Sequence, residues 1–192
     1  KETFHWLTPF NIETGKPKFA EDAEDYSEMT AQYLLKKMKE DKRVVTITSG
    51  KGGVGKTTLT ANLATALSRS IAAPVLAVDL DPQNALGLHL GMSPHELRGL
   101  SRSTLANQPL ALACLPCTPT LHVLPYGALD EADRVTLEAA MDQDPHWLAR
   151  HLASLDLPPD AVVFLDTPPG PSVYLRQALC TADVVVVVVL SD

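Results

Sequence analysis

The chain has 192 residues, 45% of them hydrophobic, which is enough for one sizeable α/β domain but not for two comfortable ones. Its net charge of −7 argues against a broad nucleic-acid-binding face, because phosphate backbones are bound by clustered Lys and Arg. No apolar run approaches the roughly 20 residues that span a bilayer, and the three cysteines form no disulfide framework. We therefore expect a cytoplasmic protein.

The N-terminal part differs from the rest of the chain. Residues 1 to about 24 lack periodicity and predict an irregular arm, whereas residues 25–42 predict a helix with acids early and lysines late, the order that a helix dipole favours. This helix either docks on a partner or membrane surface or, as we favour, packs on its own domain. We treat residues 1–42 as an extension with one helix and residues 43–192 as one domain.

From residue 43 onward, strand and helix patterns alternate. The strands are predicted at 43–48, 74–79, 121–124, 161–166 and 184–190, and the helices at 56–69, 84–90, 130–141, 145–155 and 172–180. This order predicts an α/β fold with a doubly wound, mostly parallel sheet. Residues 92–120 give no clear prediction. Because a buried parallel strand normally continues into a crossover helix, we expect the domain to continue past residue 192.

The loop between the first strand and the first helix of this domain is its most informative segment. Residues 50–57 fit the pattern G-x-x-x-x-G-K-[ST], with an additional lysine, Lys51, after the first glycine. Such a loop turns backbone N–H groups toward an anion, and the helix N-terminus adds its positive dipole end. Lys56 is expected to reach the β- and γ-phosphates, and the Thr57 hydroxyl to ligate Mg²⁺. The predicted nucleotide-binding residues here are Gly50, Lys51, Gly52, Gly53, Val54, Gly55, Lys56, Thr57 and Thr58.

Carboxylates follow two of the other predicted strands. Asp79 and Asp81 stand two positions apart, so in an extended stretch they point the same way, and they suit support of Mg²⁺ and orientation of the attacking water. The apolar strand 161–166 ends in Asp166, the form of a Walker B strand whose aspartate holds Mg²⁺ through water. Gly170 follows and is expected to offer its N–H to the γ-phosphate.

Residues 43–190, with K-G-G-V-G-K-T as the most specific part, resemble the deviant Walker ATPases typified by MinD and ParA. The resemblance implies that residues 43–192 are a P-loop ATPase domain whose sheet is of the P-loop NTPase type. The resemblance implies ATP and Mg²⁺ as cofactors and a homodimer in which Lys51 crosses to the partner's phosphates. It also implies that Asp81 positions water, that Asp79 supports magnesium and that Asp166 is the Walker B aspartate. Lys51, Lys56 and Asp81 are thereby the implied catalytic groups.

Within that family, residues 81–92 and 167–179 are most similar to the BcsQ-type ATPases of bacterial cellulose secretion systems. The resemblance implies a cytosolic, ATP-hydrolysing dimeric switch that works beside a membrane-embedded cellulose synthase. Its expected partners are subunits of the cellulose synthase or secretion complex, with peripheral association at the inner membrane. The base-reading segment of the family lies past residue 192, so adenine and guanine are not distinguished.

Two other functions stay open. A ParA-type DNA-partition ATPase also carries Asp-Pro-Gln, but this chain has no basic cluster beyond residues 36–43, and DNA is not expected as a partner. An iron–sulfur carrier ATPase is suggested by Cys114 and Cys117, a C-x-x-C pair that two subunits could combine into four thiolates. In that family the pair follows the Walker B strand, whereas here it precedes Asp166, and we favour a buried, unliganded pair. A nucleotide-binding adaptor without turnover is disfavoured, because every expected catalytic position is filled.

Overall fold

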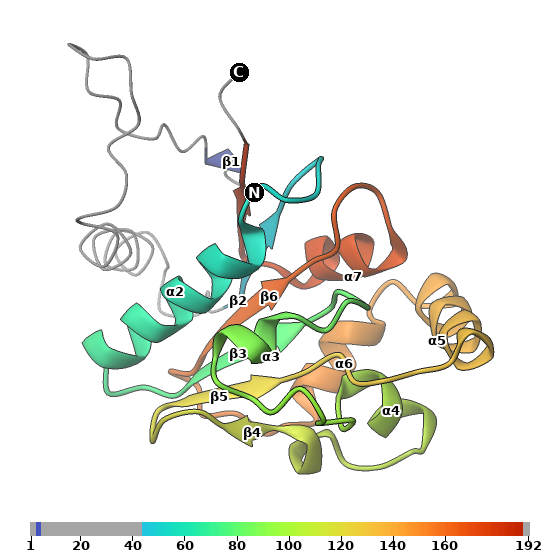
Figure 1. Ribbon diagram of the computed structural model, residues 1–192, viewed down its shortest axis with the longest axis horizontal. Helices are drawn as coiled ribbons and strands as arrows, with labels where there is room; N and C mark the ends of the chain where they lie inside the picture. The colour runs from blue at the N-terminus through green and yellow to red at the C-terminus, as the bar shows by residue number, and fades with distance from the viewer. Residues whose placement is uncertain (1–2, 5–43, 190–192) are drawn as a thin grey trace.

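The computed structural model describes residues 3–4 and 44–189, and these form one sheet with helices on both faces (Figure 1). The strand order is β1-β7-β2-β6-β3-β5-β4, and every neighbouring pair is parallel except β4 with β5. The strands are β1 (Thr3–Phe4), β2 (Val44–Thr48), β3 (Val75–Asp79), β4 (Leu115–Pro116), β5 (Leu121–Leu124), β6 (Val162–Asp166) and β7 (Val184–Val187). The predicted doubly wound α/β fold is confirmed.

The helices form two layers over this sheet. They are α2 (Lys56–Ser70), α3 (Leu86–His89), α4 (Leu100–Leu105), α5 (Glu131–Gln143), α6 (Trp147–Ala153) and α7 (Val173–Thr181), with a 3₁₀ helix, η1 (Leu110–Ala113). Buried residues of α2 and α3 share one core cluster, and those of α4 to α7 share the other. Alternate strand residues face the two clusters, as Val162 and Val163 on β6 do. Among the described residues, no helix is both long and apolar enough to cross a bilayer.

The central strands β3 and β6 are buried at all five positions, as expected for parallel strands covered by helices on both faces. Their register places Asp79 directly beside Asp166 at the carboxyl ends of the two strands. The strand β2 pairs with β6 on one side and β7 on the other, so the loop that follows β2 lies next to these carboxylates. The sheet therefore gathers at one edge the residues that the sequence singles out.

Residues 92–120, which gave no prediction, contain α4, η1 and β4. The start of α4 is fixed by distant backbone: Leu100 N–H donates to the Pro125 carbonyl, and Ser101 N–H to that of Tyr126. Gly99 lies so close to Gly127 that a Cβ at Gly99 would stand 2.3 Å from the Gly127 nitrogen. Such contacts join residues far apart in sequence, and a local pattern does not reveal them.

The predictions for the N-terminal part of the chain and for the strand ends have different outcomes. An irregular arm is wrong for Thr3–Phe4, which form β1 on the edge of β7, where Thr3 pairs with Val185. An open strand edge offers N–H and C=O groups to any extended segment, so this pairing needs no periodicity of its own. The predicted helix at residues 25–42 lies outside the described residues, as do the ends of two predicted strands at residues 43 and 190.

Candidate functional site

The phosphate loop joins β2 to α2 at the upper end of the sheet in Figure 1. Gly53 and Gly55 have φ of 72° and 87°, a left-handed conformation that glycine adopts without strain. Gly55 is the N-cap of α2, and no side chain caps the N–H groups of the first turn. These donors, at the positive end of a 15-residue helix, are therefore available to an anion.

The two lysines of the loop lie in different surroundings. Lys56 opens α2 and is 6% exposed, whereas Lys51 is exposed on the loop, where its carbonyl accepts a 2.6 Å hydrogen bond from Ser49 Oγ. The charge of Lys56 reaches Asp166 and favours its ionised form. This placement fits a lysine that serves its own nucleotide, and an exposed Lys51 can contact a group outside the chain.

Asp166 lies at the end of β6 with no exposed surface. Its Oδ1 accepts a 3.1 Å hydrogen bond from Thr60 Oγ1, while its Oδ2 is buried and has no hydrogen-bond partner among the described residues. Burial raises the pKa of this carboxyl, and the hydroxyls of Thr57 and Thr60 partly offset that rise. A buried carboxylate oxygen without a hydrogen-bond donor can accept from a water bound to a divalent cation. The residues therefore fit an Mg²⁺ ion that Thr57 would ligate and Asp166 would hold through water.

Asp79 is also buried, but both of its oxygens are occupied. Oδ1 accepts from the Asp81 N–H and Oδ2 from the Leu86 N–H, each at 2.9 Å. Burial, followed by the neighbouring charge of Asp166, raises the pKa of Asp79 to about 8. Asp79 therefore shapes the loop over residues 80–86, which we call the Asp81 loop.

The expectation that Asp79 and Asp81 share one extended stretch is wrong. β3 ends at Asp79, and Asp81 opens a turn in which its own Oδ1 accepts from Gln83 N–H at 2.9 Å and its carbonyl from Asn84 N–H at 2.8 Å. The proline that follows Asp81 and the left-handed Asn84, with φ of 52°, favour this turn over a continued strand. Asp81 remains partly exposed beside the buried carboxylates, and its charge contributes to the raised pKa of Asp166.

Gly170 is already engaged in the structure. Its N–H, which the sequence assigns to a γ-phosphate, donates to the Ser49 carbonyl of the phosphate loop at 3.1 Å. The same segment is fixed nearby by Thr167, whose hydroxyl donates to the Ile47 carbonyl at 2.9 Å. Binding of a phosphate by the Gly170 N–H therefore requires this bond to open.

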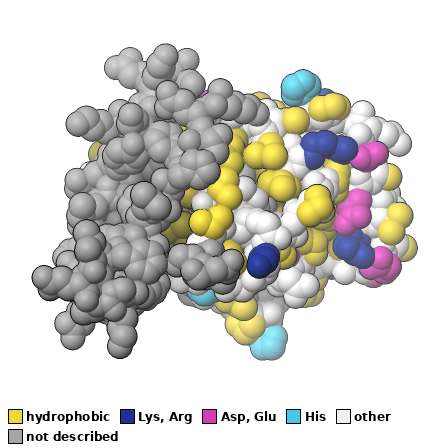
Figure 2. All heavy atoms as spheres, turned by 90° about the horizontal axis from the view of Figure 1, so that it is seen from above, with side chains coloured by type: hydrophobic (Ala, Val, Ile, Leu, Met, Phe, Trp, Pro, Cys, Tyr) yellow, Lys and Arg dark blue, Asp and Glu magenta, His cyan; other side chains and the backbone are white. Residues whose placement is uncertain are grey.

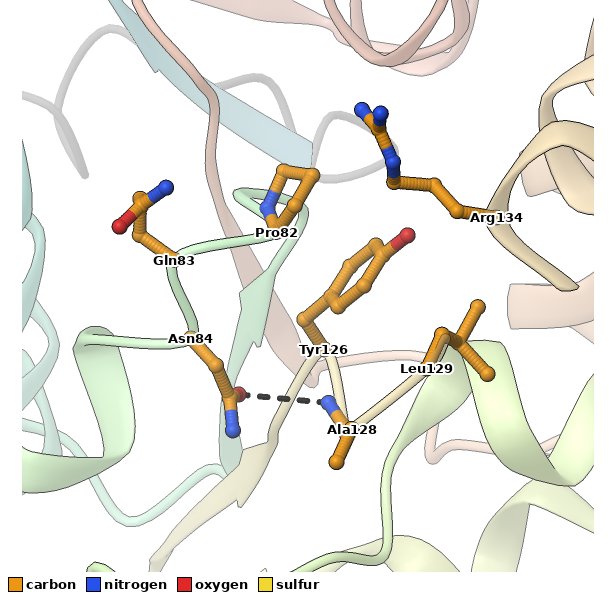
Figure 3. Close-up of a pocket in the computed structure, with 8 residues that line it drawn as sticks. Pro82, Gln83, Asn84, Tyr126, Ala128, Leu129 and Arg134 are labelled. Carbon is orange, nitrogen blue, oxygen red and sulfur yellow. Dashed lines mark hydrogen bonds between the residues drawn. The ribbon is translucent and has the colours of Figure 1, made fainter. Parts of the chain in front are cut away.

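A cavity of about 550 Å³ lies between the Asp81 loop and the residues that follow β5 (Figure 3). Pro82 and the ring of Tyr126 both line it, and Asn84 Oδ1 accepts from the Gly127 N–H at 3.3 Å. Its lining residues are Pro82, Gln83, Asn84, Tyr126, Gly127, Ala128, Leu129 and Arg134.

Sequence reasoning missed Thr60, Asn84 and Tyr126. Thr60 follows Lys56 by one helical turn, and this spacing could have placed its hydroxyl beside the Walker B strand. Asn84 and Gly127, the residue after Tyr126, are brought together by the pairing of β3 with β5, for which the sequence offers no local signal.

The two cysteines do not converge. Cys114 packs against the core cluster of α4 to α7, whereas Cys117 packs against that of α2 and α3, on the other face of the sheet. Burial raises the pKa of both thiols, that of Cys114 to about 11, so neither favours the thiolate that binds iron. In the described part of the chain, no three His, Cys, Asp or Glu side chains gather as a metal site. The structure thus gives the two thiols different surroundings.

Figure 2 views the molecule from the upper end in Figure 1. On its described surface, hydrophobic side chains gather beside the grey atoms, and basic and acidic side chains lie interspersed at the opposite edge. A broad patch of Lys and Arg is not seen among the described residues of this face.

Comparison with known proteins gives one family. The family model described as "Cellulose biosynthesis protein BcsQ" matches residues 42–192. The chromosome-partitioning ATPase Soj of Thermus thermophilus is 35% identical over 158 residues, which cover 78% of this chain and 55% of that protein. The chain spans about half the length of the curated relatives it matches.

Two solved structures share the fold. Cobyrinic acid a,c-diamide synthase of Mycobacterium smegmatis, crystallised with an ATP analogue and magnesium, is 29% identical with a TM-score of 0.63, covering 77% of this chain and 60% of that one. The septum site-determining protein MinD of Pyrococcus horikoshii, complexed with Mg-ADP, is 31% identical with a TM-score of 0.61, covering 77% and 57%.

Proposed function

The chain belongs to the cellulose biosynthesis protein BcsQ family of MinD/ParA-type P-loop ATPases, and on that premise we propose that it binds ATP with Mg²⁺ and hydrolyses it. One observation carries the proposal: a buried Asp166 oxygen without a donor lies behind Thr57 and Lys56, beneath an uncapped helix N-terminus. The relatives support it, because the named neighbours hold an ATP analogue or ADP together with magnesium.

In this proposal the phosphate loop binds the triphosphate through its backbone N–H groups. Lys56 adds a positive charge that is fixed because the side chain is buried. Thr57 and Asp166 would hold the cation, which when bound neutralises charge on the phosphate oxygens. Asp79 keeps the Asp81 loop in place by accepting hydrogen bonds from two backbone N–H groups. It would support the magnesium site because it lies beside Asp166.

Asp81 would orient the attacking water, because it is the partly exposed carboxylate beside the phosphate loop. Lys51 would reach the phosphates of a second copy across a homodimer, a contact in trans of the kind worth roughly 10³ to 10⁵ in rate. Gly170 would exchange its bond to Ser49 for a bond to the γ-phosphate. ATP binding and dimerisation would thus be coupled.

The biological role that we propose is that of a switch in bacterial cellulose synthesis, acting at the membrane with synthase or secretion subunits. The family description supports this role. DNA partition is the second candidate, favoured by the likeness to Soj, and the net charge of −7 speaks against it. Capture of a cellulose synthase subunit in ATP, set against DNA binding in ATP, separates the two.

The enzymatic part is tested with Asp81→Ala in the full chain. We expect the wild type to hydrolyse ATP and Asp81→Ala to bind ATP but lose turnover and remain an ATP-bound dimer, followed by phosphate release and light scattering. Gln83→Ala, at an exposed position in the same loop, is the matched control and should turn over normally. A monomeric Asp81→Ala protein in ATP would contradict the dimer.

A further inference from the structure

Three side chains, two of them buried, form a hydrogen-bond chain that neither binds phosphate nor supports the cation. The Tyr126 and Tyr174 hydroxyls are 2.8 Å apart, and the Tyr174 hydroxyl donates to Oε1 of Glu138 at 3.1 Å. The two tyrosines are 2% and 3% exposed. A carboxylate only accepts, so Tyr174 gives its proton to the bond with Glu138 and Tyr126 donates to the Tyr174 oxygen. The chain has one direction, from Tyr126 to Glu138.

The Glu138 end is held on α5. Arg134 Nη1 lies 3.4 Å from Glu138 Oε1, and the same guanidinium donates to both oxygens of Glu131. Burial raises the pKa of both tyrosines, so their hydroxyls stay protonated and remain donors near neutral pH. Tyr126 and Tyr174 also pack edge-on, with ring centroids 5.7 Å apart. A phenylalanine at either position can keep this packing while losing the hydroxyl.

The Tyr126 end meets the Asp81 loop. Tyr126 follows β5 and, like Pro82, lines the cavity of Figure 3. The next residue, Gly127, donates its N–H to Asn84 of the Asp81 loop, and the Tyr126 carbonyl accepts from both the N–H and the hydroxyl of Ser101. The end of β5 is thereby fixed against the loop that carries Asp81.

The Tyr174 end meets the segment that follows Asp166. Tyr174 lies in the first turn of α7, two residues after Ser172, which caps that helix by accepting from Leu175 N–H at 3.1 Å. Residues 167–172 connect Asp166 to this turn and include Gly170, whose N–H is bonded to Ser49 of the phosphate loop. The Tyr174 hydroxyl therefore fixes one end of the segment whose other end is the Walker B strand.

We propose that the Tyr126–Tyr174–Glu138 chain holds the Asp81 loop and residues 167–172 in register, and that Tyr126 and Tyr174 are positioning residues for ATP hydrolysis but not for ATP binding. The inference rests on the proposed function. Neither hydroxyl belongs to the phosphate loop, so binding does not need them. Hydrolysis does, because a water oriented by Asp81 must be aligned with a phosphate held partly by residue 170.

Tyr174→Phe in the full chain tests the inference. We expect kcat to fall about threefold to tenfold, the size of one lost hydrogen bond, with the Kd for ATP changed less than about twofold. Tyr126→Phe should behave alike, and the double variant should be no slower than the slower single, because either change breaks the same chain. Hydrogen exchange without nucleotide should be faster in Tyr174→Phe over residues 80–86 and 167–172.

Gln177→Leu is the matched control for general loosening of α7. Gln177 is buried on the same helix and bonds the Met141 and Asp144 carbonyls and the Leu148 N–H. Its loss should lower the urea midpoint at least as much as Tyr174→Phe and leave kcat unchanged at temperatures well below unfolding. An equal fall in kcat in Gln177→Leu, or additive effects of the two Tyr→Phe changes, would overturn the inference.

Failure of the inference is distinct from failure of the proposed function. An active wild type with an unchanged Tyr174→Phe kcat would overturn the inference alone. A wild type without turnover would overturn the proposed function. Hydrogen exchange of Tyr174→Phe then decides whether the hydrogen-bond chain holds the two segments together. Faster exchange over residues 80–86 and 167–172 would support that coupling, and unchanged exchange would contradict it.

Discussion

The phosphate loop and the Asp81 loop both follow buried parallel strands at the same edge of the sheet, yet they are built in opposite ways. The phosphate loop is mostly exposed, uses left-handed glycines and leaves the first N–H groups of α2 without a side-chain cap. In the Asp81 loop, carboxylates of Asp79 and Asp81 accept from the loop's own N–H groups. One loop keeps its donors for a ligand, and the other uses its donors to hold a carboxylate in place.

The largest effect is expected from changes in the phosphate loop. Lys56→Ala should weaken ATP binding by about 30-fold or more, because it removes a fixed charge from a buried site. Lys51→Ala is the matched change at an exposed position and should alter ATP binding by less than about threefold, while turnover falls by about 10³-fold. Titration calorimetry and phosphate release measure the two effects. Equal loss of binding in both variants would contradict the different roles of the two lysines.

Asp79, which holds the Asp81 loop, should make the stability of the folded chain depend on pH. The pKa of Asp79 is about 8 in the folded chain against 3.8 for an ordinary aspartate, so the folded state holds a proton that the unfolded state releases. Stability is therefore expected to be highest below pH 4 for this group and to fall as pH rises toward 8. Urea unfolding between pH 5 and 8 measures the slope.

Asp79→Asn is the control for that slope. The amide does not titrate, so the variant should be less stable throughout but should lose part of the fall with pH, while Asp166, whose pKa is also raised, keeps the rest. A variant with the same slope as the wild type would mean that Asp79 is ionised in the folded chain.

A smaller effect is expected at Asn84, which combines a left-handed backbone with a hydrogen bond to Gly127. Asn84→Gly keeps the backbone conformation and loses the bond, whereas Asn84→Ala loses both. We expect Asn84→Ala to be the less stable by about 1 kcal/mol, measured by urea unfolding. Equal stability would show that the turn relaxes away from its left-handed conformation.

The sequence predicts the phosphate loop well and the Asp81 loop poorly, for a physical reason. Most of what shapes the phosphate loop lies between residues 44 and 70, in one strand, a run of glycines and one helix, and the Gly170 N–H adds one hydrogen bond to Ser49 from outside that segment. The Asp81 loop depends on contacts of Asp79 with Asp166 across β6 and of Asn84 with Gly127 across β5. Strand order decides these contacts, and hydrophobic periodicity carries no information about strand order.

Residues 92–120, for which the sequence gives no clear prediction, also depend on contacts between residues far apart in the chain. The helix α4 is only six residues long and begins where Gly99 meets Gly127, so its position is set by the end of β5 and not by its own amphipathic pattern. The Cys114–Cys117 spacing is a local pattern with two interpretations. Only the sheet, which places the two thiols against different core clusters, distinguishes them.

The central claim is that the unpartnered Asp166 oxygen marks a site for Mg²⁺ beside bound ATP. Calorimetric titration of ATP into the full chain, with Mg²⁺ and with EDTA, tests it most directly when wild type and Asp166→Asn are compared. We expect Mg²⁺ to strengthen ATP binding to the wild type by at least about tenfold and Asp166→Asn to lose most of that gain while still binding ATP in EDTA. An Asp166→Asn protein that keeps the full Mg²⁺ gain, or a wild type that binds ATP equally in EDTA, would contradict the account.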